Sequence, residues 1–342
     1  MPVMALLLVV GPRLLPESRD PDAGRIDVRS AALSVAAVLA LVFGLKEAAT
    51  DGWSWPVGAA VAAGLALGMV FVRRQLRLED PLIDVRLFRR RSFSAALGLN
   101  LLGMFAVFSV MLFVAQYLQL VLGMSPLEAG LWSLPSAVGF VLGAAAVPLL
   151  AGRLRPGTVM AAGLAVAASG FVVIALGDGL ATLVAGSIVF SFGLSPVAAV
   201  GTELVVGAAP PERAGAASGL SETGFELGGA LGIAVIGSLA AAVYRSSIEL
   251  PDGLPAEAAA SARDTIGGAA AAAESVGGAL GAELLAAARD AFTTALSAAA
   301  TTSAVLLAVA AALAAVLLRG VGGAGGEPAA DEDGSARERA LA

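Results

Sequence analysis

Cysteine and histidine are absent from the 342 residues of this sequence. Their absence excludes disulfides, thiolate chemistry, haem ligation and the usual zinc sites, as well as Ser-His-Asp and Cys-His nucleophile pairs. Lys46 is the only lysine, and Leu45 precedes it, so the chain has no Gly-Lys-Ser/Thr phosphate loop. We therefore expect no metal, no cofactor and no enzyme activity.

Charged residues are also scarce. They make up 14% of the chain, whereas hydrophobic residues make up 58% and the mean hydropathy is +0.87. Soluble domains carry about 25% charged residues, so this composition could not cover a soluble fold of this size. The net charge of −6 arises mostly from one loop and the tail, which does not suggest nucleic-acid binding. The sequence predicts an all-α polytopic membrane protein.

Apolar blocks long enough to cross a bilayer, which takes about 20 residues, occur eight times. We expect full spans at 30–47, 56–73, 94–121, 128–150, 157–176, 180–206, 216–243 and 294–318. The opening stretch 1–10 is apolar but too short to span, and it has no basic region or cleavage pattern of a signal peptide. We interpret it as the end of a truncated membrane helix.

The distribution of basic residues predicts the orientation. If residues 11–29 form a cytoplasmic loop, the loops on that side hold 17 of the 21 Lys and Arg, with the run at 86–91 as a positive-inside anchor. Along the chain we expect a cytoplasmic loop (11–29), a two-helix linker pair (30–73), a five-helix part of a transporter bundle (94–243), an extracellular loop with short helices (244–293), a last membrane helix (294–318) and a disordered cytoplasmic tail (319–342).

Two rows of residues share the segment 216–243. Glu222 and Glu226 lie four residues apart and therefore on one helix face. A second row at the same spacing, Gly224, Gly228 and Gly232, lies about 200° away. We expect the glycine row to pack on a neighbouring helix and the carboxylates to face a cavity, where they could exchange a proton for a cation. The alternative is that Glu222 reaches the interface and Glu226 pairs with polar groups of another helix.

Other polar or helix-bending residues at membrane depth are weaker candidates. Glu203 is a further coupling candidate, although a side chain reaching the nearby interface is the simpler account. Asn100 and Gln116 could hydrogen-bond a substrate or another helix. Pro196 should kink the helix 180–206, and Gly193 beside it would ease hinging or close packing.

Three motifs together resemble one family. Glu212-Arg213-Ala214-Gly215-x-Ala217-Ser218-Gly219, followed by Glu222-x-x-Phe225-Glu226-Leu227-Gly228-Gly229, resembles helix 13 of the fourteen-helix drug:proton antiporters of the major facilitator superfamily. The stretch from Gln116-Tyr117 to Leu134-Pro135 resembles the passage from helix 9 to helix 10. Gly152-Arg153-x-x-Pro156-Gly157 resembles the second copy of the cytoplasmic gating motif.

The resemblance covers Met1 to about Leu318 and implies helices 7 to 14 with the end of helix 6. It implies a partial major facilitator fold from the quaternary-ammonium and multidrug branch, in a bacterial plasma membrane. We expect a truncated product, an incompletely read gene or one part of a split gene. Some branch members carry an acidic residue in helix 10 where this chain has Phe140, which argues against dicationic substrates.

The leading hypothesis is proton-coupled efflux of lipophilic, often cationic, drugs by alternating access. Glu226 and Glu222 would carry protons and cations, and Arg153 would help to latch the cytoplasmic side. The expected partners are the lipid bilayer, protons, small lipophilic or cationic molecules and the missing N-terminal half. The same scaffold could instead export an endogenous metabolite or lipid, or the chain could be a non-transporting partner of a complete transporter.

Overall fold

The computed structural model describes residues 27–50, 52–78, 81–83, 85–209 and 214–320. All regular elements in these ranges are helical. The bounds are α2 (Val28–Thr50), α3 (Trp55–Gln75), η1 (Val85–Arg89), α4 (Arg91–Gln116) continued by the π-helical turn η2 (Tyr117–Val121), α5 (Pro126–Ala151), α6 (Pro156–Leu176), α7 (Gly179–Gly207), α8 (Ala214–Ser247), α9 (Ala256–Asp264), α10 (Ile266–Val276) and α11 (Gly278–Leu317).

Eight of these helices are long and apolar enough to cross a membrane, which confirms the eight expected spans. The expected half-helix at 1–10, nearly all of the expected loop 11–29 and most of the tail 319–342 lie outside the described residues. We call the end of the bundle that carries η1 and the α5–α6 turn the inner end, and the opposite end the outer end.

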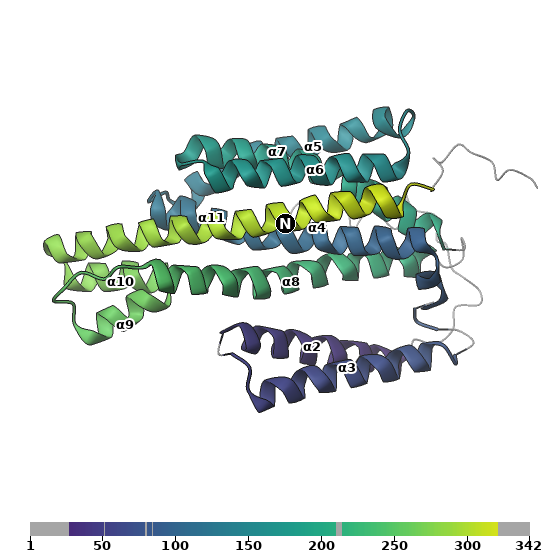
Figure 1. Cartoon of the computed structure of the whole chain (residues 1–342), viewed down its shortest axis with the longest axis horizontal. Helices are drawn as coiled ribbons and strands as arrows, with labels where there is room; N and C mark the ends of the chain where they lie inside the picture. The colour runs from purple at the N-terminus through teal and green to yellow at the C-terminus, as the bar shows by residue number, and fades with distance from the viewer. Residues whose placement is uncertain (1–26, 51, 79–80, 84, 210–213, 321–342) are drawn as a thin grey trace, which may run out of the picture.

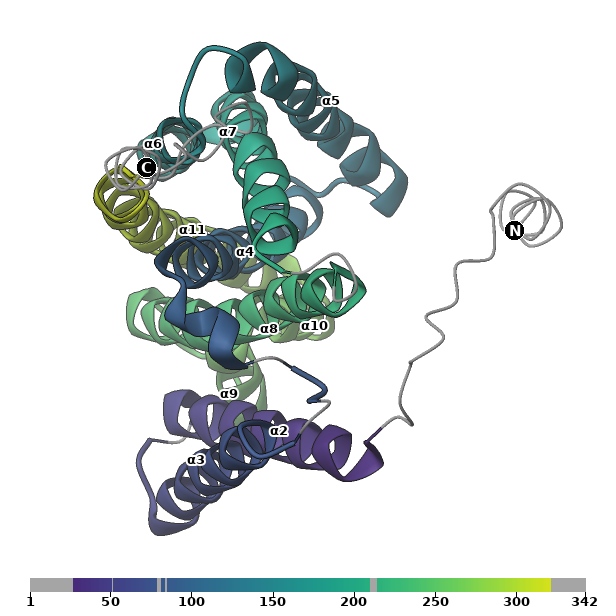
Figure 2. The ribbon, with the colours of Figure 1, turned by 90° about the vertical axis from the view of Figure 1, so that its right-hand side faces the viewer.

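The long helices form three groups (Figure 1). α5, α6 and α7 lie together, α4, α8 and α11 form a second group beside them, and the α2–α3 hairpin lies apart on the far side of α8. The view from the inner end shows α5, α7 and α8 bordering one open side of the bundle (Figure 2). Only 11% of the α5 span is buried, against 61% of the α7 span, because α5 packs almost entirely on α7.

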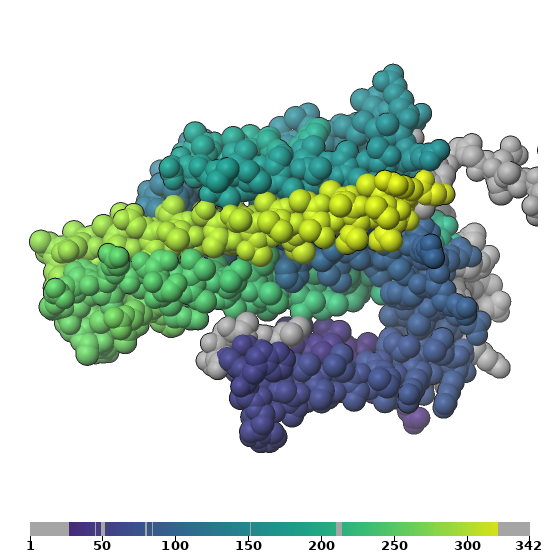
Figure 3. Space-filling model, viewed as in Figure 1, coloured from purple at the N-terminus to yellow at the C-terminus, as the bar shows by residue number. Residues whose placement is uncertain are grey.

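The last membrane helix is longer than expected. The prediction placed its start at residue 294 and assigned 244–293 to a loop with short helices. The structure confirms two short helices, α9 and α10, but α11 begins at Gly278 and has 40 residues. That length is about 60 Å, twice the hydrocarbon thickness, so the helix projects beyond the outer ends of α6 and α7 (Figure 3).

The helix exceeds the expected span because charges end an apolar span without ending a helix. Glu283, Arg289 and Asp290 interrupt the apolar pattern, but the Ala- and Leu-rich segment around them strongly favours helix outside the bilayer. Arg289 also has a partner, since its Nε donates to the carbonyl oxygen of Leu120 at 3.1 Å in the η2 turn. The Tyr244 hydroxyl joins α8 to α9 by donating to the Ala262 carbonyl at 2.9 Å.

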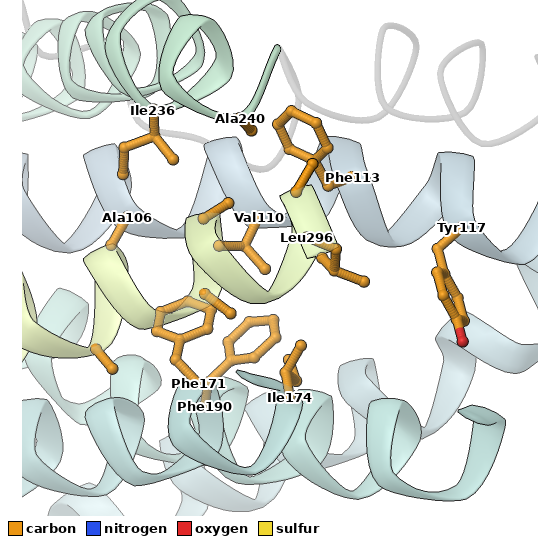
Figure 4. Close-up of a cluster of buried hydrophobic side chains, with 14 of the residues drawn as sticks. Ala106, Val110, Phe113, Tyr117, Phe171, Ile174, Phe190, Ile236, Ala240 and Leu296 are labelled. Atoms are coloured by element: carbon orange, nitrogen blue, oxygen red, sulfur yellow. The ribbon is translucent and has the colours of Figure 1, made fainter. Parts of the chain in front are cut away.

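Aromatic and small side chains fill the core between the two larger groups (Figure 4). Phe171 of α6 stacks on Phe190 of α7 with ring centroids 4.8 Å apart. Phe113 of α4 meets Phe292 of α11 at 5.7 Å. The first contact joins α6 to α7 and the second joins α4 to α11, and the buried core around them connects the two groups.

A polar cluster joins the inner ends of α2 and α3. The carboxylate of Asp27 accepts hydrogen bonds from the Ser30 hydroxyl at 2.6 Å and from the Arg74 Nη2 at 2.9 Å. Gln75 adds a bond from its Nε2 to the Ser30 hydroxyl at 2.7 Å. The hydrogen bond from Ser30, supported by Arg74, lowers the pKa of Asp27 from 3.8 to about 2. The ionised form of Asp27 therefore stabilises the hairpin.

Acid should loosen this hairpin in a defined range. Because the folded-state pKa of Asp27 is depressed, its contribution is complete above its unfolded pKa of 3.8 and is lost as the pH falls towards about 2. We expect the thermal midpoint in detergent to fall between pH 4 and pH 2. The Asp27→Asn variant should start lower and lack this component. Equal acid sensitivity of the two proteins would contradict the assignment.

The helix packing predicts a sharp difference between two glycines of α8. A Cβ on Gly232 would overlap the carbonyl oxygen of Phe105 in α4, whereas a Cβ on Gly237 would meet nothing within 4 Å. Gly232→Ala should destabilise the chain by about 1–3 kcal/mol because it pushes α4 and α8 apart. Gly237→Ala should be neutral or stabilising by up to about 1 kcal/mol. Thermal unfolding of both variants in one detergent checks this, and a Gly232→Ala midpoint equal to that of Gly237→Ala would contradict it.

Candidate functional site

The two faces of α8 are separated as expected. Gly224, Gly228 and Gly232 are buried, and a Cβ on each would meet α4 at Leu97, Leu101 and Phe105, respectively. At Gly228 and Gly232 the nearest atoms are main-chain carbonyl oxygens, so the two backbones approach closely. This contact explains why Gly228 and Gly232 must be glycine, and it turns the opposite face of α8 away from α4.

Glu222 and Glu226 lie on that opposite face, and both are exposed. Because Gly224 lies beside Leu97 and Gly228 beside Leu101, Glu226 is level with Leu99. That level is about 12 Å along α4 from Arg91, well inside the span. Within the described residues neither carboxylate has a hydrogen bond or an ion pair. The expected alternative, a polar partner for Glu226 on another helix, is not found there.

Glu203 of α7 lies at the same depth. α7 runs antiparallel to α4, and Gly201 of α7 lies against Asn100. Glu203, two residues further along α7, is therefore level with Gly98 of α4, and it is exposed. It also lies only about 6 Å from the end of α7 at Gly207, so it can reach the interface as well. The structure thus places three carboxylates from two helices in one layer.

Asn100 does not line a cavity. Its side chain is 2% exposed, lies against Gly201, and has no hydrogen-bond partner for either amide atom in the described part of the chain. In this arrangement Asn100 lies in the contact between α4 and α7, and its role as a substrate ligand stays a prediction. Its direction follows from α4, where Leu97 and Leu101 face α8, so Asn100 turns towards α7.

The other expected cavity residues are far from the carboxylate layer. Gln116 is half-buried at the end of α4, about 25 Å along the helix from the level of Glu226. Phe140 of α5 is 44% exposed, and the contacts of Gly139 and Gly143 with α7 place it about 21 Å from the level of Glu203. Gln116 and Phe140 therefore belong to the outer half and do not form one site with Glu222 and Glu226.

The expected hinge at Gly193 and Pro196 is tightly packed, and it leaves one carbonyl without a helical hydrogen bond. Gly193 is buried against the backbone of α6 at Ala167 and Gly163, so it serves close packing. Pro196 has no N–H, which leaves the Phe192 carbonyl without its usual helical donor. That carbonyl lies against Gly143 of α5. Sequence reasoning missed Gly139 and Gly143, although their four-residue spacing is a recognisable signal of close helix packing.

The gating motif Gly152, Arg153, Pro156 and Gly157 lies at the inner end. Pro156 begins α6, and Gly157 is buried against Leu318 at the end of α11. Arg155 donates to the Arg319 carbonyl at 3.3 Å, whereas Arg153 is exposed and has no partner among the described residues. The motif therefore docks on α11, and the proposed latching role of Arg153 stays a prediction.

No group of three acidic residues in the described ranges could hold a metal ion. The chemistry available at the carboxylate layer is uptake and release of protons, and attraction of cations from an exposed helix surface at membrane depth.

Comparison with known proteins gives a consistent family. The profile of the Major Facilitator Superfamily matches residues 23–233. The multidrug efflux pump LfrA of Mycolicibacterium smegmatis is 40% identical over 298 residues, which cover 86% of this chain and 59% of that protein. The methyl viologen resistance protein SmvA of Salmonella typhimurium is 30% identical over 295 residues, covering 85% of this chain and 60% of that protein.

Two further similarities extend this result. The tetracenomycin C resistance and export protein of Streptomyces glaucescens is 33% identical over 246 residues, covering 70% of this chain and 46% of that protein. The crystal structure of a bacterial homolog of the human lysosomal transporter Spinster, inward-facing and unoccupied, has a TM-score of 0.52 at 15% identity. It matches 86% of this chain and 70% of its own, and it supports the fold. The chain thus spans at most three-fifths of the length of these three curated relatives.

The unpaired amide of Asn100 predicts an effect on stability. Removing a buried polar group that has no partner should be stabilising, and Leu has a similar size. We expect Asn100→Leu to raise the stability of the chain by about 1–3 kcal/mol, measured by thermal unfolding in detergent. Leu99→Asn, which adds an amide one residue away, is the opposite control and should destabilise. A lower midpoint for Asn100→Leu would show that the amide has a stabilising partner in the membrane.

Proposed function

The chain belongs to the major facilitator superfamily, and from that premise we propose that it takes part in proton-coupled efflux of lipophilic, often cationic, drugs. The observation that carries the proposal is the pair Glu222 and Glu226, exposed at membrane depth on the face of α8 opposite its glycine row. The names of the two relatives LfrA and SmvA, an efflux pump and a methyl viologen resistance protein, support the direction of transport and the cationic cargo.

The proposed cycle uses each carboxylate in two states. When ionised, Glu226 attracts a cation from the inner side, and when protonated it releases that cation. A proton entering from outside would therefore drive a cation out, provided that the carboxylates face the two sides in turn. Glu222 lies one helical turn nearer the inner end, and Glu203 on α7 adds negative charge at the same depth.

Alternating access needs a second group of helices that moves against this one. α5, α7 and α8 border the open side of the bundle (Figure 2), and Glu203, Glu222 and Glu226 are exposed on the last two. We propose that the part of the relatives that this chain does not match corresponds to a domain that covers this side. The substrate and protons would then pass between the two, in a plasma membrane with the C-terminus in the cytoplasm.

Export of an endogenous metabolite is the second candidate. One specific observation favours it, namely that a relative from Streptomyces glaucescens is a tetracenomycin C resistance and export protein. The carboxylate layer suits any cargo that carries a positive charge, so the two candidates share a mechanism and differ in substrate.

The test uses the full chain in cells that lack their own efflux pumps. It is expressed alone and together with the segment of the mycobacterial relative that this chain does not match. Glu226→Gln should reduce pH-driven extrusion of a cationic dye by more than about tenfold, because glutamine cannot bind and release a proton. Glu257→Gln, an exposed carboxylate of α9 outside the layer, is the matched control and should leave extrusion unchanged.

Unchanged extrusion in Glu226→Gln would refute the role of Glu226. Extrusion only when the second segment is present would support the two-domain arrangement. No pH-driven flux in either background, with normal amounts of protein in the membrane, would favour a non-transporting role.

A further inference from the structure

A separate cavity lies at the outer end of the bundle. It has a volume of about 650 Å³, and it forms where the turn between α6 and α7 meets α11, with Tyr117 of η2 on its wall. This volume lies in the range of small-molecule sites, about 300–1,000 Å³. The level of Tyr117 is about 27 Å along α4 from that of Glu226, so the cavity is distinct from the carboxylate layer.

Position along α11 puts the cavity near the outer membrane surface. Its α11 residues run from Thr293 to Thr302, which are about 36 Å and 22 Å, respectively, from the inner end of the helix at Leu317. A hydrocarbon core of about 30 Å therefore ends within this stretch. An occupant would have one part among lipid tails and the other among headgroups, which suits an amphiphile.

Five serine and threonine hydroxyls line the cavity, and each has used its only proton. Thr293, Thr294, Thr301 and Thr302 each donate to the carbonyl four residues earlier, and Ser297 donates to the Ala175 carbonyl of α6. A hydroxyl has one donor and two acceptor positions, so only acceptor positions remain at these five residues. A ligand that donates hydrogen bonds can use these acceptor positions.

The charged groups that line the cavity also favour a positively charged ligand. Asp178 is exposed on the lining, and no Lys or Arg lines the cavity. Arg289 lies one turn outward from Thr293 and keeps its positive charge, but it does not line the cavity, and its Nε donates to the Leu120 carbonyl. The positive N-terminus of α7 also begins beside Asp178, whose carboxylate opposes it. The C-terminus of α6 adds partial negative charge.

Tyr117 places a further polar atom at the cavity. The residue is only 6% exposed, and its hydroxyl has no hydrogen-bond partner in the described residues. The ring extends from η2 towards α6 and α7, with its oxygen at the far end beyond Ile174 and Leu296 (Figure 4). Since both of these apolar side chains also line the cavity, the phenol completes a site with apolar walls and a polar end.

We propose that this outer cavity binds an amphiphile with a primary ammonium head and an apolar chain. The head donates its hydrogen bonds to Tyr117, to the threonine hydroxyls and to Asp178, and the chain lies against Ile174, Leu183 and Leu296. Two sources carry this head, an aminophospholipid of the outer leaflet and a lipophilic primary amine. The proposal does not depend on Glu222 or Glu226.

The absence of cysteine allows a direct test on the full chain. Thr294→Cys places one thiol in the cavity, and Ser169→Cys places one on the exposed surface of α6 outside it. The chain is reconstituted in phosphatidylcholine vesicles, and the rate of maleimide labelling is measured with dodecylamine, dodecyltrimethylammonium or dodecanoate. Dodecylamine should slow labelling of Thr294→Cys in a saturable way and leave Ser169→Cys unaffected.

The hydrogen bonds should be visible in the concentration that gives half of this effect. That concentration should rise about tenfold with dodecyltrimethylammonium, which has no N–H donors, and with dodecylamine when Tyr117→Phe is combined with Thr301→Val. Slow labelling in phosphatidylethanolamine vesicles without added amine would identify the lipid as the occupant, and unchanged labelling there would identify the free amine. Both outcomes support the site.

Three results would overturn the proposal. The first is protection of Thr294→Cys by dodecanoate as strong as that by dodecylamine. The second is protection by dodecylamine that Tyr117→Phe combined with Thr301→Val does not weaken. The third is slowing of labelling at Ser169→Cys equal to that at Thr294→Cys. Glu226→Gln should leave the protection unchanged, so failure of the transport proposal and failure of this one are distinguishable.

Discussion

The contact between glycines of α8 and main-chain carbonyls of α4 is the constraint on which the rest of the structure depends. In a bilayer, apolar side chains gain little by leaving lipid for protein, so helices associate through close packing of their surfaces. Gly228 and Gly232 bring α8 against the carbonyls of Leu101 and Phe105. This fixes both the register and the rotation of α8. The exposed direction of Glu222 and Glu226 is a consequence of that packing.

The same device recurs across the bundle. α6 and α7 meet at Gly163 and Gly193, and α5 meets α7 at Gly139 and Gly143, where the opposing atoms include carbonyl oxygens. At each contact, the opposite face of the helix is not covered by that neighbour. The polar residues then separate by depth, with carboxylates in the inner half on α7 and α8 and hydroxyls on α11 at the level of the outer ends of α6 and α7. Two distinct chemical environments thus result from one mode of packing.

Contacts between helices show that several candidate residues from the sequence lie in different surroundings. Asn100 and Gln116 look alike in sequence, as polar side chains within an apolar span, and Phe140 was singled out by the family resemblance. The register separates them, because Asn100 turns into the α4–α7 contact while the other two lie more than one-third of a span further out. Periodicity along one helix gives the face that a residue occupies. It does not identify the helix that covers this face.

The sequence by itself determined the number of spans, their approximate ends and the opposed faces of α8, because bilayer thickness and helical periodicity are local rules. It also predicted short helices after α8. Only the tertiary structure decided that α11 begins at Gly278, that Glu203 shares the depth of Glu226, and that Tyr117 meets the hydroxyls of α11 in an outer cavity. These features join residues up to 185 positions apart, from Tyr117 to Thr302, and their proximity follows from the packing of several helices together.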